Sequence, residues 1–246
     1  MGEKRYDDER FFRKYSEMLR SQKGLAGAGE WPALQKLLPD FSGQRVLDLG
    51  CGYGWHCRYG ADCGAASVLG IDLSERMLRR AAELNSGPQI TYRRADIEEL
   101  DFPADSFDIV LSSLAFHYVR DFPRLIGGVS RWLRAGGALV FSVEHPVFTA
   151  YGSQDWYYGE NGEILHFPVD RYYIEGERDA VFLGEYVTKY HRTLTSYLDA
   201  LLQAGFALER VVEPQPPEDM MDLPGMRDEL RRPMMLLVAA RKGRRG

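Results

Sequence analysis

Short apolar runs alternate with amphipathic segments between residues 45 and 143, and this alternation constrains the fold more than any other feature of the chain. The runs that read as strands are 46–49, 67–71, 90–92, 107–111 and 138–143. Ser74 is placed to cap a helix over 75–84, and Asp121 to cap another through Leu133 that Gly136 and Gly137 stop. Because apolar strands alternating with helices form parallel sheets covered on both faces, the pattern predicts an α/β core that binds ligands at the carboxyl ends of its strands.

The segments on either side of this core have different patterns. In the first forty residues Phe11, Tyr15 and Leu19 recur at helical spacing, and glycines interrupt before a second short helix around 31–38. After residue 144 the alternation stops, and it resumes with a helix over 193–204 ended by Gly205, a strand over 206–212 and a last strand over 234–240. We therefore expect a helical segment at 1–40, a core formed by 41–144 and 191–246, and an insertion at 145–190.

The insertion at 145–190 is aromatic and acidic. It holds 11 of the 30 Phe, Trp and Tyr residues, about twice its share by length, and eight acidic residues against three basic ones. The rest of the chain has 28 of each sign, so the formal net charge of -5 is local to the insertion. Its aromatic residues either pack a small cap or line a pocket. The charge favours a neutral or cationic small molecule over a polyanion and argues against nucleic acid as a partner.

Two further features bound the class of protein. No apolar run reaches the length of a membrane span, and the amino terminus is charged without a following apolar stretch, so we expect a cytoplasmic protein without a membrane partner. The cysteines at 51, 57 and 63 match no common zinc spacing, and their odd number closes no disulfide set. We therefore expect free thiols and no metal, and the oligomeric state stays open.

A glycine-rich turn follows the first predicted strand, in the stretch VLDLGCGYG at 46–54. Glycines there let the backbone approach a ligand closely, and the amino terminus of the following helix adds unpaired N–H donors. The second strand ends at Asp72, where a carboxylate can accept hydrogen bonds from both hydroxyls of a ribose. The third strand is followed by Asp96 and Ile97, which can frame the edge and face of an adenine. The three strand ends together predict a nucleotide-like site.

With these motifs the chain resembles the class I S-adenosylmethionine-dependent methyltransferases, in particular the type 11 branch of small-molecule enzymes. The matching stretches are VLDLGCGYG at 46–54, GIDLS at 70–74, RADIEEL at 94–100, FDIVLSSLAFHYV at 107–119 and LRAGGALVFSVEHP at 133–146. The resemblance implies a Rossmann-like, doubly wound, mostly parallel seven-stranded sheet with an antiparallel last strand. It also implies that residues 1–40 form a lid and that the cofactor is S-adenosylmethionine, with S-adenosylhomocysteine as its product. Our own hypothesis from the aromatic composition of 145–190 is that this segment forms a cap on the acceptor side.

Family roles carry over by position. The resemblance places the glycine turn beside the methionine part of the cofactor, Asp72 at the ribose, and Asp96 with Ile97 at the adenine. The residues after the fourth strand would lie near the sulfonium, and lid residues would complete the site. The expected cofactor-binding residues are Tyr15, Arg20, Gly50, Cys51, Gly52, Asp72, Leu73, Met77, Asp96, Ile97, Ser112 and Leu114, with Ser113 and Trp31 as further neighbours.

Several other functions remain open to a chain with these motifs. An NAD-dependent oxidoreductase uses the same turn, but its glycines are spaced G-x-G-x-x-G, whereas Gly50, Gly52 and Gly54 are alternate. Asn/Asp-Pro-Pro-Tyr does not follow the fourth strand, so amide and adenine-amine methylators of that pattern are unsupported. A protein or RNA methyltransferase and a cofactor-binding module without catalysis are the remaining alternatives.

Three histidines are candidates for a general base, which an acceptor needs only if it must lose a proton at neutral pH. His117 lies just past the fourth strand and His145 at the end of the fifth, both at the ligand edge of the sheet, so these two are the catalytic candidates. Each can equally make a structural hydrogen bond. His191, placed at the start of the closing helix, is expected to be structural.

Overall fold

The computed structural model describes residues 4–243, and its centre is a seven-stranded sheet in the order β10-β11-β5-β4-β1-β2-β3. The strands are β1 (Arg45–Leu49), β2 (Ser67–Asp72), β3 (Ile90–Arg94), β4 (Phe107–Ser113), β5 (Leu133–Glu144), β10 (Phe206–Val212) and β11 (Met235–Lys242). Neighbouring strands are parallel except that β11 runs antiparallel to both β5 and β10. The predicted doubly wound sheet with an antiparallel last strand is confirmed.

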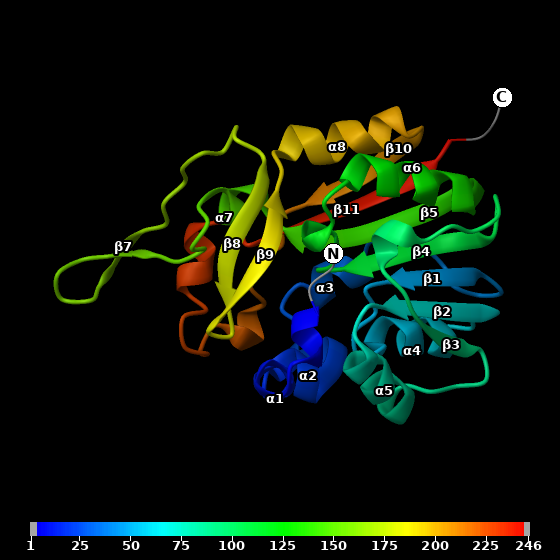
Figure 1. Cartoon of the computed structure of the whole chain (residues 1–246), viewed down its shortest axis with the longest axis horizontal. Helices are drawn as coiled ribbons and strands as arrows, with labels where there is room; N and C mark the ends of the chain where they lie inside the picture. The colour runs from blue at the N-terminus through cyan, green and yellow to red at the C-terminus, as the bar shows by residue number, and fades with distance from the viewer. Residues whose placement is uncertain (1–3, 244–246) are drawn as a thin grey trace.

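Helices cover both faces of the sheet, as Figure 1 shows. On one face α6 (Phe122–Trp132) and α8 (Leu194–Gln203) pack on Leu47, Val110 and Leu139. On the other, α3 (Trp31–Gln35), α4 (Trp55–Asp62) and α5 (Glu75–Leu84) pack on residues of alternate register such as Val46 and Ile109. Both sides of each central strand are therefore apolar, which explains the continuous hydrophobic runs in the sequence.

Capping side chains begin the helices where the sequence predicts. Ser74 accepts a hydrogen bond from the N–H of Met77 at the start of α5, and Asp121 accepts one from Arg124 at the start of α6. The predicted end of α6 at Leu133 is within one residue of the observed end, but Gly136 and Gly137 do not stop the helix, because they lie inside β5. The helix ends at Trp132, because Leu133 is already extended, fully buried and paired with Phe107 of β4.

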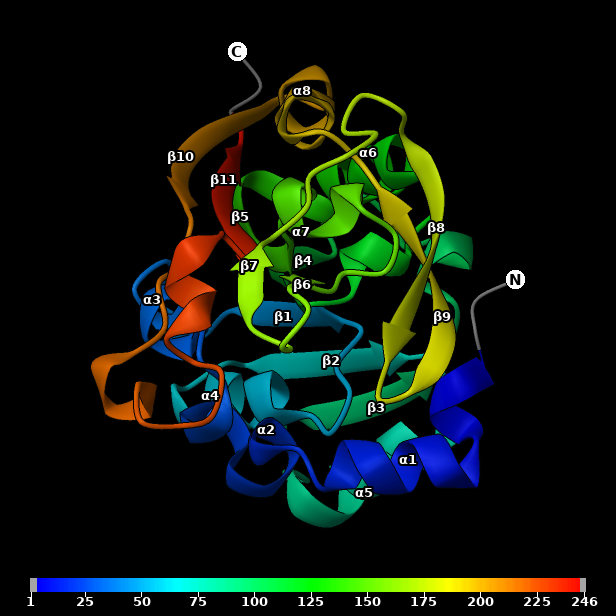
Figure 2. The same ribbon diagram turned by 90° about the vertical axis from the view of Figure 1, so that its left-hand side faces the viewer.

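The amino-terminal segment is helical but more broken than its periodicity predicts. It contains a 3-10 turn η1 (Lys4–Asp7), α1 (Glu9–Ser16), α2 (Leu19–Lys23) and a second 3-10 turn η2 (Gly24–Gly27) before α3. The predicted first helix is divided at Met18, whose backbone is extended (φ −64°, ψ 146°). Figure 2 shows α1 and α2 crossing the end of the sheet near β3.

Residues 145–190 follow directly from the carboxyl end of β5. They form α7 (Pro146–Ala150), the hairpin β6 (Tyr157–Tyr158) with β7 (Ile164–His166), and the hairpin β8 (Gly176–Phe182) with β9 (Glu185–His191). In Figure 1 these elements lie to the left of the sheet, at the same end as the carboxyl terminus of β5. The Pro-rich loop between β10 and β11 contains the 3-10 turns η5 (Glu218–Met220) and η6 (Asp228–Arg231).

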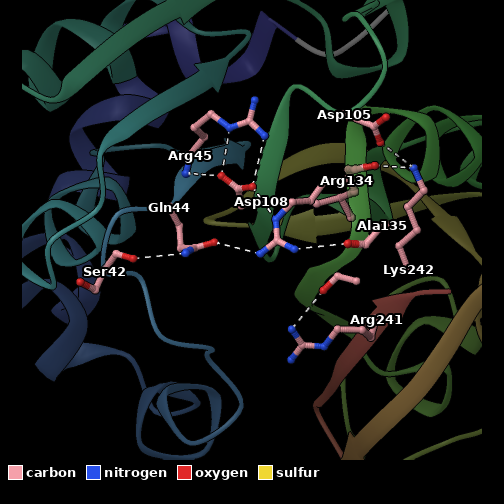
Figure 3. A network of polar contacts seen from close by, with 11 residues as sticks. Ser42, Gln44, Arg45, Asp105, Asp108, Arg134, Ala135, Arg241 and Lys242 are labelled. Atoms are coloured by element: carbon pink, nitrogen blue, oxygen red, sulfur yellow. Dashed lines mark hydrogen bonds and ion pairs between the residues drawn. The ribbon is translucent and has the colours of Figure 1, made fainter. Parts of the chain in front are cut away.

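The opposite end of the sheet is fastened by ion pairs around Asp108, drawn in Figure 3. One carboxylate oxygen accepts hydrogen bonds from the backbone N–H and the Nε of Arg45 at 2.8 and 3.0 Å, and the other accepts one from Arg134 Nε at 2.6 Å. Partial burial by itself raises the pKa of Asp108, but these hydrogen bonds outweigh it and lower the pKa to about 2. Because this end holds the amino termini of the parallel strands, the network is structural. Within residues 4–243, no helix is long and apolar enough to cross a membrane.

Candidate functional site

The glycine turn after β1 is built from three residues in the left-handed region, Gly50, Gly52 and Gly54, with φ of 76°, 52° and 75°. The N–H groups of Gly50 and Cys51 both donate to the carbonyl of Ile71 in β2, at 2.8 and 2.9 Å. A Cβ on Gly50 would lie 2.3 Å from the Cβ of Ala115, whereas one on Gly52 would meet no atom of the described chain within 4 Å. The turn therefore touches the loop after β4 on one side and is open at Gly52.

Asp72 at the end of β2 is joined directly to this turn. One of its oxygens accepts a hydrogen bond from Gly52 N–H and the other from Ser74 N–H, both at 2.9 Å. Burial raises the pKa of Asp72, although these hydrogen bonds oppose the shift. The structure thus brings together the predicted turn and the predicted ribose carboxylate. Leu73 follows Asp72, and Met77 is buried in the first turn of α5.

Asp96 and Ile97 lie at the end of the neighbouring strand β3 and begin the 3-10 turn η3 (Ile97–Glu99). Asp96 accepts a hydrogen bond from the N–H of Glu98 at 3.0 Å, and Ile97 packs against the core beside α6. Because β2 and β3 are parallel neighbours, these residues and Asp72 follow adjacent strand ends. The adenine role of Asp96 and Ile97 stays a prediction.

A pocket lies between the glycine turn and the segment 15–30. It is lined by Tyr15, Arg20, Ser21, Gly24, Leu25, Ala28, Glu30, Gly50, Cys51, Gly52, Tyr53, Trp55, His56 and Ser113. Six of the residues that the sequence analysis names are in this set, three of them from the turn. The other named residues lie outside the lining, and Trp31 instead packs on Tyr59 with ring centroids 4.9 Å apart.

Sequence reasoning named Arg20 but missed the other polar residues that complete the pocket. Arg20 forms an ion pair with Glu30, whose side chain is 2% exposed. Four buried polar atoms on lining residues have no hydrogen-bond partner among the described residues: Ser21 Oγ, Glu30 Oε2, Tyr53 Oη and Trp55 Nε1. Buried polar atoms are seldom left unpaired, so the pocket is suited to a polar ligand. No local pattern around Glu30 marks it as a site residue, because the pocket forms only when 15–30 and 50–56 meet.

The loop after β4 is held rigidly beside the turn. Ser112 Oγ donates to the carbonyl of Leu49 at 2.8 Å, and Leu114 N–H donates to the carbonyl of Ser142 at 2.9 Å. Leu114 has a φ of 53°, a left-handed conformation that is unfavourable for a branched side chain and that these contacts maintain. The carboxyl ends of β1, β4 and β5 are therefore tied together at the pocket.

The candidate catalytic histidines are both buried and hydrogen-bonded. His117 Nδ1 accepts the N–H of Glu144 at 3.3 Å, and burial lowers the pKa of His117 to about 4. The ring is then neutral with its proton on Nε2, so that nitrogen donates rather than accepts. His145 Nδ1 accepts the N–H of Val147 at 3.0 Å to cap α7, and its Nε2 lies 2.7 Å from Glu213 Oε1. The cap that Nδ1 provides and the proximity of Nε2 to Glu213 both favour a structural role for His145.

His191 ends β9 instead of beginning α8. Its ring nitrogens lie 2.8 Å from Thr149 Oγ1 and 2.8 Å from the carbonyl of Tyr172, and the residue is fully buried. The expected structural role is consistent with these contacts.

A buried charged cluster joins the end of β5 to the insertion. Lys189 of β9 donates to Glu144 at 2.6 Å and to Gln154 at 2.8 Å. Burial by itself raises the pKa of Glu144, but His117 and Lys189 beside it produce a net lowering. By contrast, seven of the eight acidic residues of 145–190 are exposed on the outer surface, while Arg178 and Lys189 are buried. The acidic excess of the insertion is therefore on its outside.

Comparisons with known proteins place this geometry in context. A family model described as a methyltransferase domain matches residues 47–141. The chain is 53% identical to a putative S-adenosylmethionine-dependent methyltransferase of Listeria monocytogenes, over 89% of this chain and 99% of that one, with a TM-score of 0.85. It is 47% identical to an S-adenosylmethionine-dependent methyltransferase of Mesorhizobium loti, over 89% and 100% of the two chains, with a TM-score of 0.82. An uncharacterized protein of Haemophilus influenzae is 34% identical over 96% of both chains.

Proposed function

Because the chain belongs to the S-adenosylmethionine-dependent methyltransferases, we propose that it transfers the methyl group of this cofactor to a small-molecule acceptor. The observation that supports the binding mode is the pocket at the glycine turn, whose charged pair and unpartnered polar atoms suit a zwitterion. Arg20 can pair with the carboxylate of a methionine group and Glu30 with its ammonium, and each can do so without leaving its present ion pair. The open face at Gly52 accepts the rest of the ligand without a Cβ in its way.

The adenosyl part is assigned to the neighbouring strand ends. Asp72 has two hydrogen bonds from backbone N–H groups and further lone pairs on the same oxygens, which can accept both ribose hydroxyls. Asp96 and Ile97, with Leu73 and Met77, are proposed for the adenine. In this assignment Cys51, Ser112 and Leu114 contribute mainly backbone near the sulfur.

The chain's own residues act mainly by orientation and by exclusion of water. When bound, the cofactor supplies a methyl group on a positively charged sulfur, which a nucleophilic atom of the acceptor displaces in line. The tied loop Ser112–Leu114 fixes the floor of the site. Tyr6 packs edge-on against Tyr15 and Tyr118, with ring centroids 5.5 and 6.4 Å apart. His117 serves as a hydrogen-bond donor through Nε2, because its Nδ1 is occupied and its pKa of about 4 keeps it neutral.

The acceptor is proposed to be neutral or cationic and to bind under the insertion 145–190. The outer acidic residues do not determine this preference, since they face solvent. Support comes instead from the inner surface, where Glu144 neutralises Lys189 and the rings of the half-buried Tyr6 and Tyr118 pack together. The free thiols of Cys51, Cys57 and Cys63 suit a reducing compartment, which supports the cytoplasm as the place of action.

Calorimetry with S-adenosylmethionine and with NAD, followed by an acceptor screen for S-adenosylhomocysteine release, tests this function. We expect wild type to bind S-adenosylmethionine with micromolar affinity and not to bind NAD. Asp72→Ala should lose about 1–2 kcal/mol or more of the binding free energy for S-adenosylmethionine. Asp62→Ala is the matched control, because Asp62 is an exposed carboxylate in α4 that, among residues 4–243, forms an ion pair with Arg58 alone. Binding of NAD, or equal binding by Asp72→Ala and wild type, would refute the proposed site. Turnover of anionic acceptors alone would refute the proposed acceptor class.

A further inference from the structure

Asp7, at the end of η1, contacts the amino terminus of α5 from outside the core. Its Oδ1 accepts hydrogen bonds from the Ser74 hydroxyl at 2.6 Å and from the N–H of Arg76 at 3.2 Å. Arg94 at the end of β3 lies 3.8 Å from the other oxygen. Although partial burial raises the pKa of Asp7, the hydrogen bonds from Ser74 and Arg76 give a net lowering, so the carboxylate is charged at neutral pH.

Ser74 links Asp7 to the cofactor carboxylate. The backbone N–H of Ser74 donates to Asp72, and the hydroxyl of the same residue accepts from Met77 N–H while donating to Asp7. A continuous set of hydrogen bonds therefore connects Asp7, Ser74, Asp72 and Gly52. A serine hydroxyl has one proton to donate, and Ser74 donates it in the hydrogen bond to Asp7. That proton is then directed away from Asp72, whose remaining lone pairs stay available to a ligand.

Asp7 belongs to an amino-terminal segment that packs against Tyr118 and the β8–β9 hairpin. The Tyr6 hydroxyl lies 3.2 Å from that of Tyr118, and the Tyr6 ring packs edge-on against Phe11. Phe11 is fully buried against the β8–β9 hairpin, where Lys14 also donates to the carbonyl of Leu183 at 2.7 Å. The position of Asp7 is thus fixed from the acceptor side of the molecule, independently of α5.

We propose that Asp7 is a positioning residue for the cofactor, which holds the turn after β2 and the Ser74 proton so that Asp72 receives the ribose hydroxyls. The proposal rests on the proposed function, in which Asp72 binds the ribose. A purely structural Asp7 would only pin the amino-terminal segment to α5. The two roles predict different effects of removing Asp7. If Asp7 positions Asp72, its loss weakens the binding only of ligands that have ribose hydroxyls. If Asp7 only pins the amino-terminal segment, its loss weakens the binding of every ligand of the pocket.

The test is calorimetry of S-adenosylhomocysteine and its 2′,3′-dideoxyribose analogue with wild type, Asp7→Ala, Asp7→Asn and Asp8→Ala. Wild type should prefer S-adenosylhomocysteine by about tenfold or more, the effect of roughly one charge-assisted hydrogen bond. Asp7→Ala should lose most of that preference, with the analogue binding as it does to wild type. Asp7→Asn retains an acceptor oxygen and should fall between the two. Asp8 caps α1 through Phe11 N–H, so Asp8→Ala loosens the same segment and should keep the wild-type preference.

Equal weakening of both ligands by Asp7→Ala, or loss of the preference in Asp8→Ala, would overturn the positioning role and leave the assignment of Asp72 intact. If wild type itself binds both ligands equally, the ribose assignment of Asp72 fails, and this inference fails with it. Thermal melts of the ligand-free variants serve as the check that each is folded.

Discussion

Gly50→Ala tests the requirement for a close approach between the glycine turn and the loop after β4. The new side chain would adopt a φ of 76°, which costs an L-residue about 1–2 kcal/mol. Its Cβ would also lie 2.3 Å from the Cβ of Ala115, a contact with no flexible atom to give way, which adds about 1–3 kcal/mol of overpacking. We therefore expect urea unfolding to show a loss of about 2–5 kcal/mol.

Two matched variants separate these contributions. Gly52 has a φ of 52° but open space around its Cβ position, so Gly52→Ala should cost only the conformational part, about 1–2 kcal/mol. Gly52→Ala should nevertheless weaken S-adenosylhomocysteine binding about tenfold or more, because the methyl group enters the open side of the turn. Ala115→Gly added to Gly50→Ala should recover about 1–3 kcal/mol. Equal destabilisation by Gly50→Ala and Gly52→Ala, with no recovery in the double variant, would refute the close-approach argument.

Three further predictions concern stability. Asp108→Asn should lower the free energy of unfolding by about 2 kcal/mol at pH 7, because the folded pKa of Asp108, about 2, lies below the ordinary value of 3.8. This stabilisation is present above pH 4 and is lost as the pH falls toward 2. A difference in urea midpoints between the two proteins that stays constant down to pH 2 would contradict the prediction. The pKa of His117 is about 4 in the folded protein and about 6.5 in the unfolded chain, so the unfolded chain binds the proton first as the pH falls. Between pH 6.5 and pH 4 the free energy of unfolding of wild type should therefore fall by up to about 3 kcal/mol relative to that of His117→Gln. Parallel curves of stability against pH for the two proteins would rule this out. Thr193 Oγ1 caps the amino terminus of α8 by accepting the N–H of Ser196, so Thr193→Ala should lower stability by about 1 kcal/mol in thermal melts. Thr195 is exposed in the same helix, and Thr195→Ala should be within about 0.5 kcal/mol of wild type. Equal effects of the two substitutions would exclude the capping role.

Local patterns were sufficient to predict most of the sheet. The strands at 45–49, 67–72 and 206–212 alternate with capped helices, and each signal lies within a few residues of the element it marks. The end of α6 is predicted to within one residue, but the start of β5 at Leu133, five residues before the predicted strand, is not, because it depends on pairing of Leu133 with the distant Phe107. Propensity is outweighed where a buried strand partner is available.

In the site, too, local sequence patterns predict some residues, and only contacts between distant segments bring in the others. The glycine turn and Asp72 follow strands directly, so strand prediction locates both of them at one edge of the sheet. Glu30 and Asp7 reach that edge from the amino-terminal segment, and only the tertiary packing of that segment brings them there. The composition of the insertion likewise predicts its net charge but not which charged side chains are exposed. In the structure most of its acidic side chains are exposed, while Lys189 is buried beside Glu144.

The position of β11 has a consequence for biosynthesis. This strand pairs along β5 from Met235 opposite Glu144 to Arg241 opposite Ala138, and it follows all the other strands in the chain. Until residues 235–242 have left the ribosome, one edge of β5 has exposed N–H and C=O groups, and such edges promote aggregation. We expect nascent chains that stall before Met235 to depend on chaperones, even though the glycine turn and Asp72 are translated much earlier.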